Sequence, residues 1–193
     1  MKAYYHARAR EYDAWWLAQG LYEPAPAGWA EERDRLFEIV RALPPVRTLD
    51  VACGTGFVTR LLPGEVVGLD QSEAMLEVAR EQAPEAELVH GDGTELPFAD
   101  RSFDRVFTSH FYGHLEEPDR LRFLAEARRV ASELVVADAA PHGGAQRAEW
   151  EERLLSDGTT QVYKRFFTGA GLAAELGGGR VLHEGRWFVL IAA

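Results

Sequence analysis

The segment Leu49–Gly56, with the sequence LDVACGTG, decides the fold that this chain predicts. It begins as an apolar run, which is typical of a buried strand, and it ends in a glycine turn ahead of a short predicted helix over Phe57–Leu62. Gly54 and Gly56 have no Cβ, so the backbone of the turn can adopt positive φ and approach a ligand closely. A strand, a glycine turn and a helix in this order indicate an α/β sheet with a ligand at the carboxyl end of its first strand.

The segments around this turn alternate between apolar runs and helical patterns. The predicted strands are Val46–Ala52, Glu65–Leu69, Glu87–His90, Arg105–Thr108 and Leu134–Ala137, and the helices between them are Ser72–Gln82 and Pro118–Val130. Such alternation indicates a parallel sheet with crossover helices. Near the end of the chain, a helix over Thr168–Leu176 precedes two strands, Arg180–His183 and Trp187–Ile191, joined as a tight hairpin. The predicted fold class is α/β, a Rossmann-like seven-stranded and mostly parallel sheet with an antiparallel C-terminal hairpin and helices on both faces.

Two predicted helices precede the sheet. Tyr5, Tyr12 and Trp16 recur at helical spacing among charged residues, which predicts an amphipathic helix over Ala3–Leu17. A second helix is predicted over Trp29–Leu43, where two prolines end it.

The composition is that of an ordinary globular protein with an acidic balance. The chain has 193 residues, with 21 Lys and Arg against 31 Asp and Glu, and a formal net charge of −10. This balance argues against nucleic acid as a partner. Cys53 is the only cysteine, which excludes an intramolecular disulfide and a cysteine-cluster metal site and suits a reducing cytoplasm. No uninterrupted apolar run approaches the roughly 18 residues that span a bilayer, so we expect a cytoplasmic protein without a membrane partner.

Asp70 follows Asp50 by 20 residues and closes the second predicted strand. An acidic side chain at this place can accept hydrogen bonds from both hydroxyls of a ribose. A Gly-x-Gly-x-x-Gly pattern that starts at Gly54 has Thr59 where its third glycine should be, so the dinucleotide fingerprint is incomplete. A pyrophosphate also fits poorly beside the carboxylate of Asp50, whereas a ligand with an amine fits well. These residues favour an adenosine cofactor that is not a dinucleotide.

Three segments together, Asp50–Gly56, Asp70 and Gly91-Asp92-Gly93, resemble the class I S-adenosylmethionine-dependent methyltransferases of the type 11 kind. The likeness covers about Val46–Ala139, and it implies S-adenosyl-L-methionine as the cofactor and methyl transfer as the activity. Ala52 stands where the family has a glycine, which narrows the loop without blocking it. By this resemblance, the methionine part of the cofactor contacts Asp50, Ala52, Gly54, Thr55 and Gly56, the ribose contacts Asp70 beside Gln71, the adenine contacts Met75, Asp92 and Gly93, and the backbone carbonyl of His110 faces the cofactor amine.

Some of these residues also have a purely structural interpretation. Ser72 is a typical N-cap of its helix, and Met75 at helical spacing with Val78 is typical of a core position. Cys53 is interpreted as a packing residue, because no catalytic base stands beside it in the sequence.

The acceptor of the methyl group would bind near Thr108–Leu115, TSHFYGHL, which follows the fourth predicted strand. Methyl transfer mainly requires alignment of the reactants, and a general base is needed only where the acceptor must lose a proton. His110 and Tyr112 are the candidate bases. His114 resembles a family histidine, and it is also explained as a structural histidine bonded to a neighbouring backbone group. The remaining candidates for the acceptor pocket are Tyr12, Trp16 and His142, the last paired with Asp138 after the fifth strand.

We expect the acceptor to be a small molecule, because the chain has no basic run and lacks the Asp/Asn-Pro-Pro-Tyr/Phe motif of enzymes that methylate amino groups of adenine or glutamine. No metal is expected, and we expect a monomer or a homodimer. Two alternatives stay open. One is an NAD-dependent oxidoreductase on the same architecture, and the other is a catalytically silent S-adenosylmethionine-binding protein, whose acceptor pocket would be filled by its own aromatic side chains. We expect one domain over residues 1–193, with a helical cap over 1–43, a cofactor-binding core over 44–139, and C-terminal helices with the hairpin over 140–193.

Overall fold

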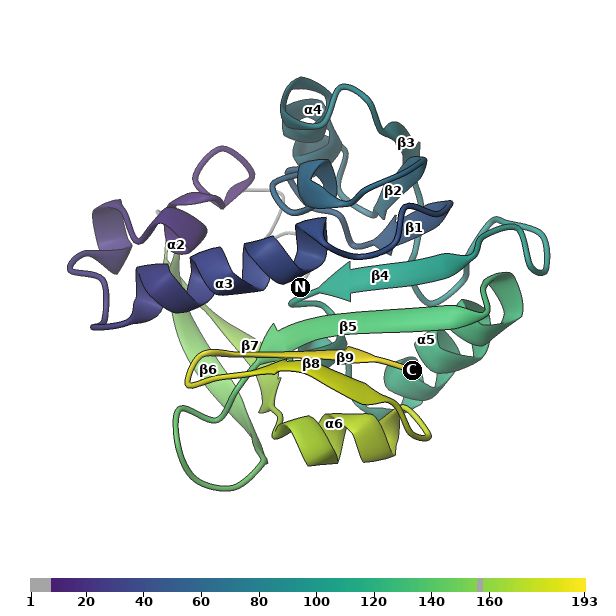
Figure 1. Cartoon of the computed structure of the whole chain (residues 1–193). Coiled ribbons are helices and arrows are strands. Elements are labelled where there is room, and N and C mark those ends of the chain that lie inside the picture. The colour runs from purple at the N-terminus through teal and green to yellow at the C-terminus, as the bar shows by residue number, and fades with distance from the viewer. Residues whose placement is uncertain (1–7, 156–157) are drawn as a thin grey trace.

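The computed structural model describes residues 8–155 and 158–193, and a seven-stranded sheet runs through this part of the chain (Figure 1). Its strands are β1 (Thr48–Val51), β2 (Val66–Asp70), β3 (Glu87–His90), β4 (Arg105–Ser109), β5 (Glu133–Ala139), β8 (Arg180–Glu184) and β9 (Phe188–Ala192). They lie in the order β3-β2-β1-β4-β5-β9-β8. Neighbouring strands from β3 to β5 are parallel, whereas β9 is antiparallel to both β5 and β8. The predicted fold class is confirmed, including the C-terminal hairpin.

The order of the strands determines where a ligand can bind. From β1 the chain moves outward to β2 and β3 on one side, and it then returns to β4 on the other side of β1. In sheets of this kind, ligands bind outside the carboxyl ends of the strands at the point where the order reverses, which here lies between β1 and β4. All residues of β1 and β2 are buried, as expected for strands of a parallel sheet that is covered on both faces.

Helices cover both faces of the sheet. They are α2 (Ala14–Leu17), α3 (Trp29–Arg41), α4 (Glu73–Gln82), α5 (Glu117–Val130) and α6 (Gly169–Glu175), with the short 3₁₀ helices η1 (Gly20–Tyr22), η2 (Thr59–Leu61) and η3 (Tyr112–His114). On one face, α3 packs on the sheet around Phe107 and Phe188, and on the other face α5 and α6 pack around Val106 and Val136. Among the helices of the described residues, none is long and apolar enough to cross a membrane.

The start of α4 agrees with the sequence. The hydroxyl Oγ of Ser72 accepts a hydrogen bond from the backbone N–H of Met75 at 3.4 Å, so Ser72 is the N-cap that the sequence predicts. This cap fixes the turn that follows Asp70 at the end of β2.

The predicted helix over Ala3–Leu17 is wrong between residues 9 and 13, which form turns. Its first part, including Tyr4 and Tyr5, lies outside the described residues. The carboxylate of Asp13 accepts hydrogen bonds from Thr55 Oγ1 and from Gln82 Nε2, both at 2.5 Å. These contacts hold the segment against the glycine turn and α4, so a tertiary contact overrides the helical spacing of the aromatic residues.

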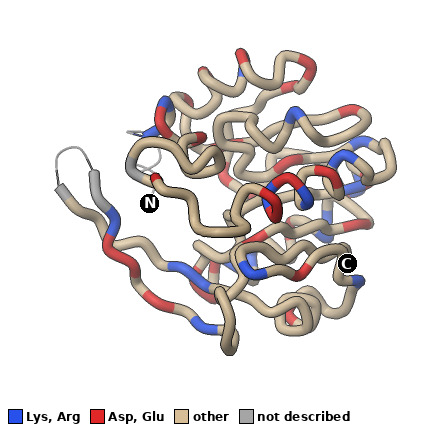
Figure 2. The backbone as a smooth tube through the Cα atoms, turned by 60° about the vertical axis from the view of Figure 1, so that its left-hand side comes forward, with Lys and Arg blue, Asp and Glu red and all other residues tan. Residues whose placement is uncertain are grey.

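Between β5 and α6, where the sequence predicts no strand, the structure has a further pair of strands. Strands β6 (Arg147–Leu155) and β7 (Gly158–Phe166) form a separate antiparallel ribbon that projects from the sheet and carries charged residues along its length (Figures 1 and 2). Val162, Lys164 and Phe166 of β7 are buried in alternation, with a period of two. A lysine at the middle buried position breaks the apolar alternation that would have predicted this strand.

Glu32 of α3 fastens this helix to the β8–β9 hairpin, and its removal should destabilise the fold. Its carboxylate accepts hydrogen bonds from the backbone N–H groups of Arg186 (2.9 Å), Trp187 (2.8 Å) and Phe188 (2.9 Å). Glu32→Ala leaves these donors without a charged acceptor, so we expect the free energy of unfolding to fall by ~2 kcal/mol. Urea unfolding measures the change. Glu31→Ala is the control, because Glu31 is exposed in the same first turn; an equal effect of both substitutions would contradict the prediction.

Candidate active site

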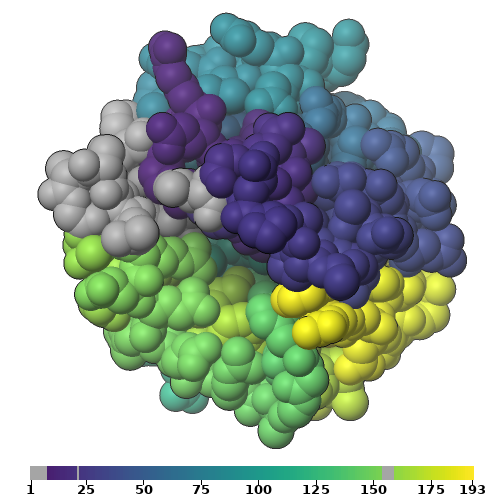
Figure 3. Space-filling view, turned by 90° about the vertical axis from the view of Figure 1, so that its left-hand side faces the viewer, coloured from purple at the N-terminus to yellow at the C-terminus, as the bar shows by residue number. Residues whose placement is uncertain are grey.

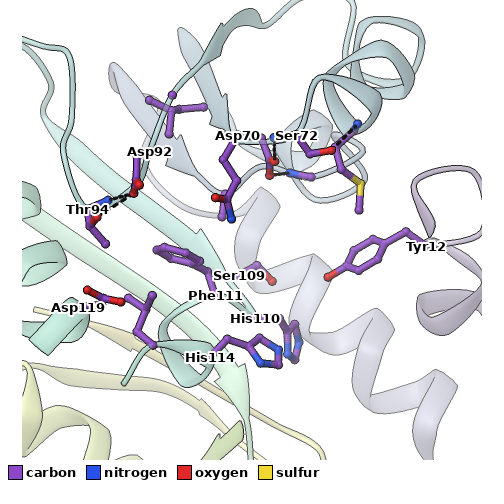
Figure 4. Close-up of a pocket in the computed structure, with 18 residues that line it drawn as sticks. Tyr12, Asp70, Ser72, Asp92, Thr94, Ser109, His110, Phe111, His114 and Asp119 are labelled. Carbon is purple, nitrogen blue, oxygen red and sulfur yellow. Dashed lines mark hydrogen bonds between the residues drawn. The ribbon is translucent and has the colours of Figure 1, made fainter. Parts of the chain in front are cut away.

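A cleft of about 230 Å³ lies at the carboxyl ends of β1, β2 and β4 (Figure 4). The following predicted cofactor residues line it: Ala52, Gly54, Asp70, Gln71, Met75, Asp92, Gly93 and His110. Asp50 and Thr55 line a smaller lobe of about 30 Å³, which shares the walls formed by Ala52, Gly54 and His110. The sheet thus brings together residues that lie up to 60 positions apart in the sequence.

Gly56 is the predicted cofactor residue that lines neither space. A Cβ at this position would lie 3.1 Å from the Cβ of Ala83 and 3.2 Å from the Cα of Ala79, so Gly56 allows α4 to approach the turn. Its φ of 78°, with 57° at Gly54 and 59° at Ala52, shows that the turn uses the left-handed region three times. The two glycines therefore serve different purposes. Gly54 leaves the wall of the cleft open, and Gly56 allows α4 to pack against the turn.

Asp50 is a buried carboxyl group at the end of β1. Its Oδ2 accepts a hydrogen bond from Thr59 Oγ1 at 2.7 Å, and its side chain is withdrawn from water. Burial raises the pKa of Asp50 from 3.8 to about 7; the hydrogen bond from Thr59 opposes this shift and the charge of Asp70 adds to it. A cationic group in the neighbouring lobe would favour the ionised form of Asp50.

Asp70 and Asp92 occupy the wall of the cleft formed by the ends of β2 and β3 (Figure 4). The carboxylate of Asp70 accepts hydrogen bonds from the backbone N–H groups of Gly54 (2.9 Å) and Ser72 (2.8 Å), which ties the glycine turn to the start of α4. Asp92 Oδ1 accepts from both the N–H and the Oγ1 of Thr94, each at 2.8 Å. Each carboxylate is therefore held in one orientation by local bonds, and each retains lone pairs for a ligand.

Gly93 is the glycine beside Asp92 whose conformation is set by close packing. A Cβ here would lie 2.8 Å from Val51 Cγ1 and 2.9 Å from Phe111 Cζ. The backbone of Gly93 thus forms the cleft wall directly.

His110 lies where β4 ends, between the cleft and the aromatic residues of the N-terminal segment. The residue is 9% exposed, and its ring has edge-on contacts with Trp15 and Trp16 at centroid distances of 4.7 and 5.1 Å. Burial, together with the charge of Lys164, lowers the pKa of His110 to about 3 although Asp138 opposes the shift. Among the described residues, nothing forms a hydrogen bond with Nε2 of His110 or with Oγ of Ser109, and both atoms are buried. A polar ligand in the cleft would relieve the cost of these two buried atoms.

Tyr112, the second candidate base, points away from the cleft. It is 1% exposed, it packs on Phe123 and Phe167, and its hydroxyl donates to Glu175 Oε2 at 3.3 Å. Burial raises its pKa to about 12. Tyr112 points inward because η3 directs its side chain into the hydrophobic core that contains Phe123 of α5. It cannot reach a reactant in the cleft, so the prediction that Tyr112 is a base is corrected.

A second space of about 450 Å³ adjoins the cleft, and we call it the chamber. Tyr12, His110 and His114 line both spaces, so they form the boundary between them. The chamber has an aromatic side, formed by Trp15, Tyr22, Trp29, Phe166 and Trp187, and a charged side, formed by Arg8, Glu151, Glu152, Arg153 and Lys164. Figure 3 shows the hollow between the N-terminal segment in purple and the β6–β7 ribbon in green. The sequence did not indicate the charged side, because the ribbon that supplies it was not predicted.

The four residues predicted for the acceptor pocket have different surroundings. Tyr12 and His142 line the chamber, and His142 has an edge-on contact with Trp187 at 4.6 Å. His114 also lines it, while its Nδ1 lies 2.7 Å from the carbonyl oxygen of Tyr163, a backbone bond of the kind that its structural interpretation expects. Trp16 does not line the chamber; it is 3% exposed and stacks on Phe188 in the hydrophobic core.

The described residues contain no group of three or more His, Cys, Asp or Glu side chains placed to hold a metal ion. Cys53 is a buried free thiol whose pKa is raised well above its ordinary value, mainly by burial.

A family model described as a methyltransferase domain matches residues 49–133, which run from β1 to the start of β5. The core of this chain, from β1 to the start of β5, is thus similar to a methyltransferase domain. This match confirms the family resemblance, and the matched range contains Asp50, Asp70, Asp92 and His110.

Similar proteins extend the comparison beyond this domain. The demethylmenaquinone methyltransferase of Thermotoga maritima is 42% identical over 103 residues, 51% of this chain and 44% of that protein. The enzyme of the same name from Renibacterium salmoninarum is 38% identical over 130 residues, 64% of this chain and 54% of that protein. The chain thus spans about half the length of the curated relatives it matches. A solved structure described as a "DhpI-SAM-HEP complex" superposes with a TM-score of 0.74 at 28% identity, and covers 98% of this chain and 94% of its own.

The methyltransferase domain as matched ends before β6 and β7. The predicted cofactor residues therefore lie inside the matched range, whereas the ribbon side of the chamber lies outside it.

Proposed function

We propose that this protein transfers a methyl group from S-adenosylmethionine to a small molecule held in the chamber. The observation that carries the proposal is the junction of two spaces: a cleft with carboxylates at the ends of adjacent strands opens, past His110 and Tyr12, onto a chamber of about 450 Å³. Two reactants bound in these spaces would meet at a defined boundary. The chamber volume is in the range of small-molecule sites.

The residues of the cleft fit the cofactor in chemistry as well as in position. Asp50 offers a buried carboxyl group for the amine, and Asp70 offers the acceptor oxygens that a ribose diol needs. Asp92 can accept from the adenine amino group, beside the bare backbone of Gly93. The unpartnered Oγ of Ser109 and Nε2 of His110 give a polar ligand two further atoms to bond.

The chain has to align the reactants and exclude water. Bound S-adenosylmethionine would supply an electrophilic methyl group that needs no further activation. Tyr12 closes the boundary from the N-terminal side, and its segment is fastened to the glycine turn through Asp13 and Thr55. His110, with a pKa of about 3, is neutral and a weak base at neutral pH. Orientation in a closed site therefore accounts for the catalysis better than proton removal by His110 or Tyr112 does.

Two structural observations argue against the alternatives. Thr59, which stands at the third position of the dinucleotide pattern, donates its hydroxyl to Asp50, so its side chain fills the place that a glycine would leave open. A silent protein would have its acceptor pocket filled by aromatic side chains, whereas the aromatic residues described here line the chamber walls and leave its volume open.

The raised pKa of Asp50 gives a prediction for cofactor affinity. Below about pH 7 the carboxyl group of the ligand-free protein is protonated, so a cationic amine gains less from it. We expect the affinity for S-adenosylhomocysteine to rise from about pH 5 to pH 7, by at most about tenfold per pH unit, and then to level off. Calorimetric titration across this range measures it. Asp50→Asn keeps the shape and should remove the rise; identical pH profiles for both proteins would refute the prediction.

The same shift affects stability with the opposite trend. Because the folded carboxyl group of Asp50 holds its proton up to about pH 7 while the unfolded one ionises near 3.8, the ligand-free protein loses stability as the pH rises through this interval.

Turnover tests the class of acceptor. The protein is incubated with S-adenosylmethionine and either the ultrafiltered small-molecule fraction or the macromolecular fraction of a bacterial extract, and S-adenosylhomocysteine is measured. We expect release with the small-molecule fraction and far less release with Asp70→Ala. Release that depends only on the macromolecular fraction would contradict a small-molecule acceptor.

A further inference from the structure

Lys164 of β7 is a buried ammonium group in the wall of the chamber. The residue is 4% exposed, and its Nζ donates to Asp138 Oδ1 at 2.7 Å. Within the described part of the chain, this is the one hydrogen bond of the ammonium group, which has three N–H donors. A buried ammonium with unused donors is costly unless a further acceptor completes it.

Asp138 neutralises the charge of Lys164 only in part. Its carboxylate, which is fully buried, also accepts hydrogen bonds from the backbone N–H groups of Gly113 (2.7 Å) and Ala139 (2.8 Å). Part of its negative charge is thus balanced by these two amides. Asp138 is thus held by three hydrogen bonds, from Lys164, Gly113 and Ala139. The remaining donors of Lys164 belong to a side chain that lines the chamber.

The other charges of the chamber leave this ammonium as its most deeply buried cation. Glu151 is paired with Arg153 at 2.7 Å, and Glu152 lies within 3.4 Å of the hydroxyl of Thr159. On the N-terminal wall, Arg8 donates to the phenol oxygen of Tyr22 at 2.7 Å. Burial is the main cause that lowers the pKa of His110 and of His114, and the charges of Lys164 and Arg153 lower both further. This agrees with a positive potential at the boundary between chamber and cleft.

We infer that the chamber binds an acceptor that carries an anionic oxygen, such as a carboxylate or a phosphoryl group on an aromatic or apolar body, and that Lys164 is the residue that binds this oxygen. The inference rests on the proposed function, which makes the molecule in the chamber the acceptor of the methyl group. The apolar body would lie on Trp15, Trp29 and Trp187, and the anion would face the ribbon. An acceptor oxygen that is already ionised would attack the methyl carbon with its own electron pair, while the pair of the broken carbon–sulfur bond stays on sulfur, so no base has to take a proton.

Binding of small anions tests this assignment without turnover. Benzoate and phenyl phosphate are titrated calorimetrically into the protein, and benzamide serves as the neutral match for benzoate. We expect both anions to bind at least about tenfold more tightly than benzamide, the difference that a charged hydrogen bond makes. A preference between benzoate and phenyl phosphate identifies the carboxylate or the phosphoryl group. Equal binding of benzoate and benzamide would overturn the inference.

Variants then locate the anion at Lys164. Lys164→Met should lower anion affinity about tenfold or more without changing benzamide binding, whereas Lys164→Arg should keep most of the affinity. Arg180→Met is the matched control, because it removes the same charge from an exposed residue of β8 and should change neither. Unchanged anion binding in Lys164→Met would overturn the inference. If Lys164→Met does not fold, the variant Asp138→Asn with Lys164→Met replaces it, since it leaves no unpaired charge.

The same samples separate this inference from the proposed function. S-adenosylhomocysteine should bind the wild type and Lys164→Met alike, because Lys164 does not line the cleft. If the wild type binds S-adenosylhomocysteine but does not prefer benzoate over benzamide, the inference alone is refuted. If the wild type does not bind S-adenosylhomocysteine, the proposed function is refuted, and the anion titrations still decide the role of Lys164.

Discussion

Asp70→Ala should lower the affinity for S-adenosylmethionine by about 100-fold. The carboxylate lies at the end of β2 in the cleft wall, and its loss would remove the acceptor that we propose for two ribose hydroxyls. Each hydrogen bond to a charged group contributes about 1.5–3 kcal/mol, so the lower end of this range gives roughly 3 kcal/mol for two such bonds, which corresponds to about 100-fold in affinity. The substitution also releases the N–H of Gly54 and the N–H of Ser72, which loosens the glycine turn. Calorimetry with S-adenosylmethionine and S-adenosylhomocysteine measures the loss.

Asp92→Ala should have a smaller effect in the same assay, about tenfold, because one hydrogen bond to the adenine amino group is lost. Asp34→Ala is the control for charge, since Asp34 is exposed on α3. Thermal unfolding of each variant shows whether the fold survives. If folded Asp70→Ala and Asp92→Ala proteins both bind with unchanged affinity, these carboxylates do not hold the cofactor.

Asp138→Ala should reduce the free energy of unfolding by about 3–5 kcal/mol, the largest effect on stability that we expect for a single substitution. It leaves the buried ammonium of Lys164 without its partner and removes the acceptor for the N–H groups of Gly113 and Ala139. Burial by itself would raise the pKa of Asp138, but the charge of Lys164 and the hydrogen bond from its ammonium group hold it below its ordinary value. Its ionised form is therefore part of the folded state, and this contribution is lost as the pH falls through that low pKa.

A double variant isolates the pair. Asp138→Ala combined with Lys164→Met removes both charges, so it should be more stable than Asp138→Ala alone, and the coupling between the two positions should exceed 1 kcal/mol. Urea unfolding of the wild type, both single variants and the double variant gives the complete cycle. Additive losses would show that the two residues do not stabilise each other.

The parallel sheet could be predicted from the sequence because each strand and each turn shows its pattern within a short segment of the chain. The run Leu49–Gly56 contains strand, turn and glycines in one segment, and β3 has the predicted bounds Glu87–His90. The carboxylates Asp50, Asp70 and Asp92 stand near the carboxyl ends of predicted strands or shortly after them, and parallel strands end at one edge of a sheet. Their convergence on one cleft therefore follows from the order of the strands.

The chamber could not be predicted in the same way, because its walls depend on long-range contacts. The β6–β7 ribbon has an acidic and basic sequence, and its buried alternation includes Lys164, whose partner Asp138 is 26 residues away. Tyr112 was a reasonable candidate base by its position after β4, but a one-turn 3₁₀ helix directs it into the core. The direction of a side chain within a short turn is set by packing, which a single sequence does not display.

Titration of the purified protein with S-adenosylmethionine, S-adenosylhomocysteine and NAD, in parallel and by calorimetry, tests the central claim most directly because it requires no knowledge of the acceptor. The carboxylates of the cleft and the incomplete dinucleotide pattern at Thr59 predict that the first two ligands bind and that NAD releases no heat. Binding of NAD without binding of either S-adenosyl compound would contradict the assignment of this cleft to a methyl donor.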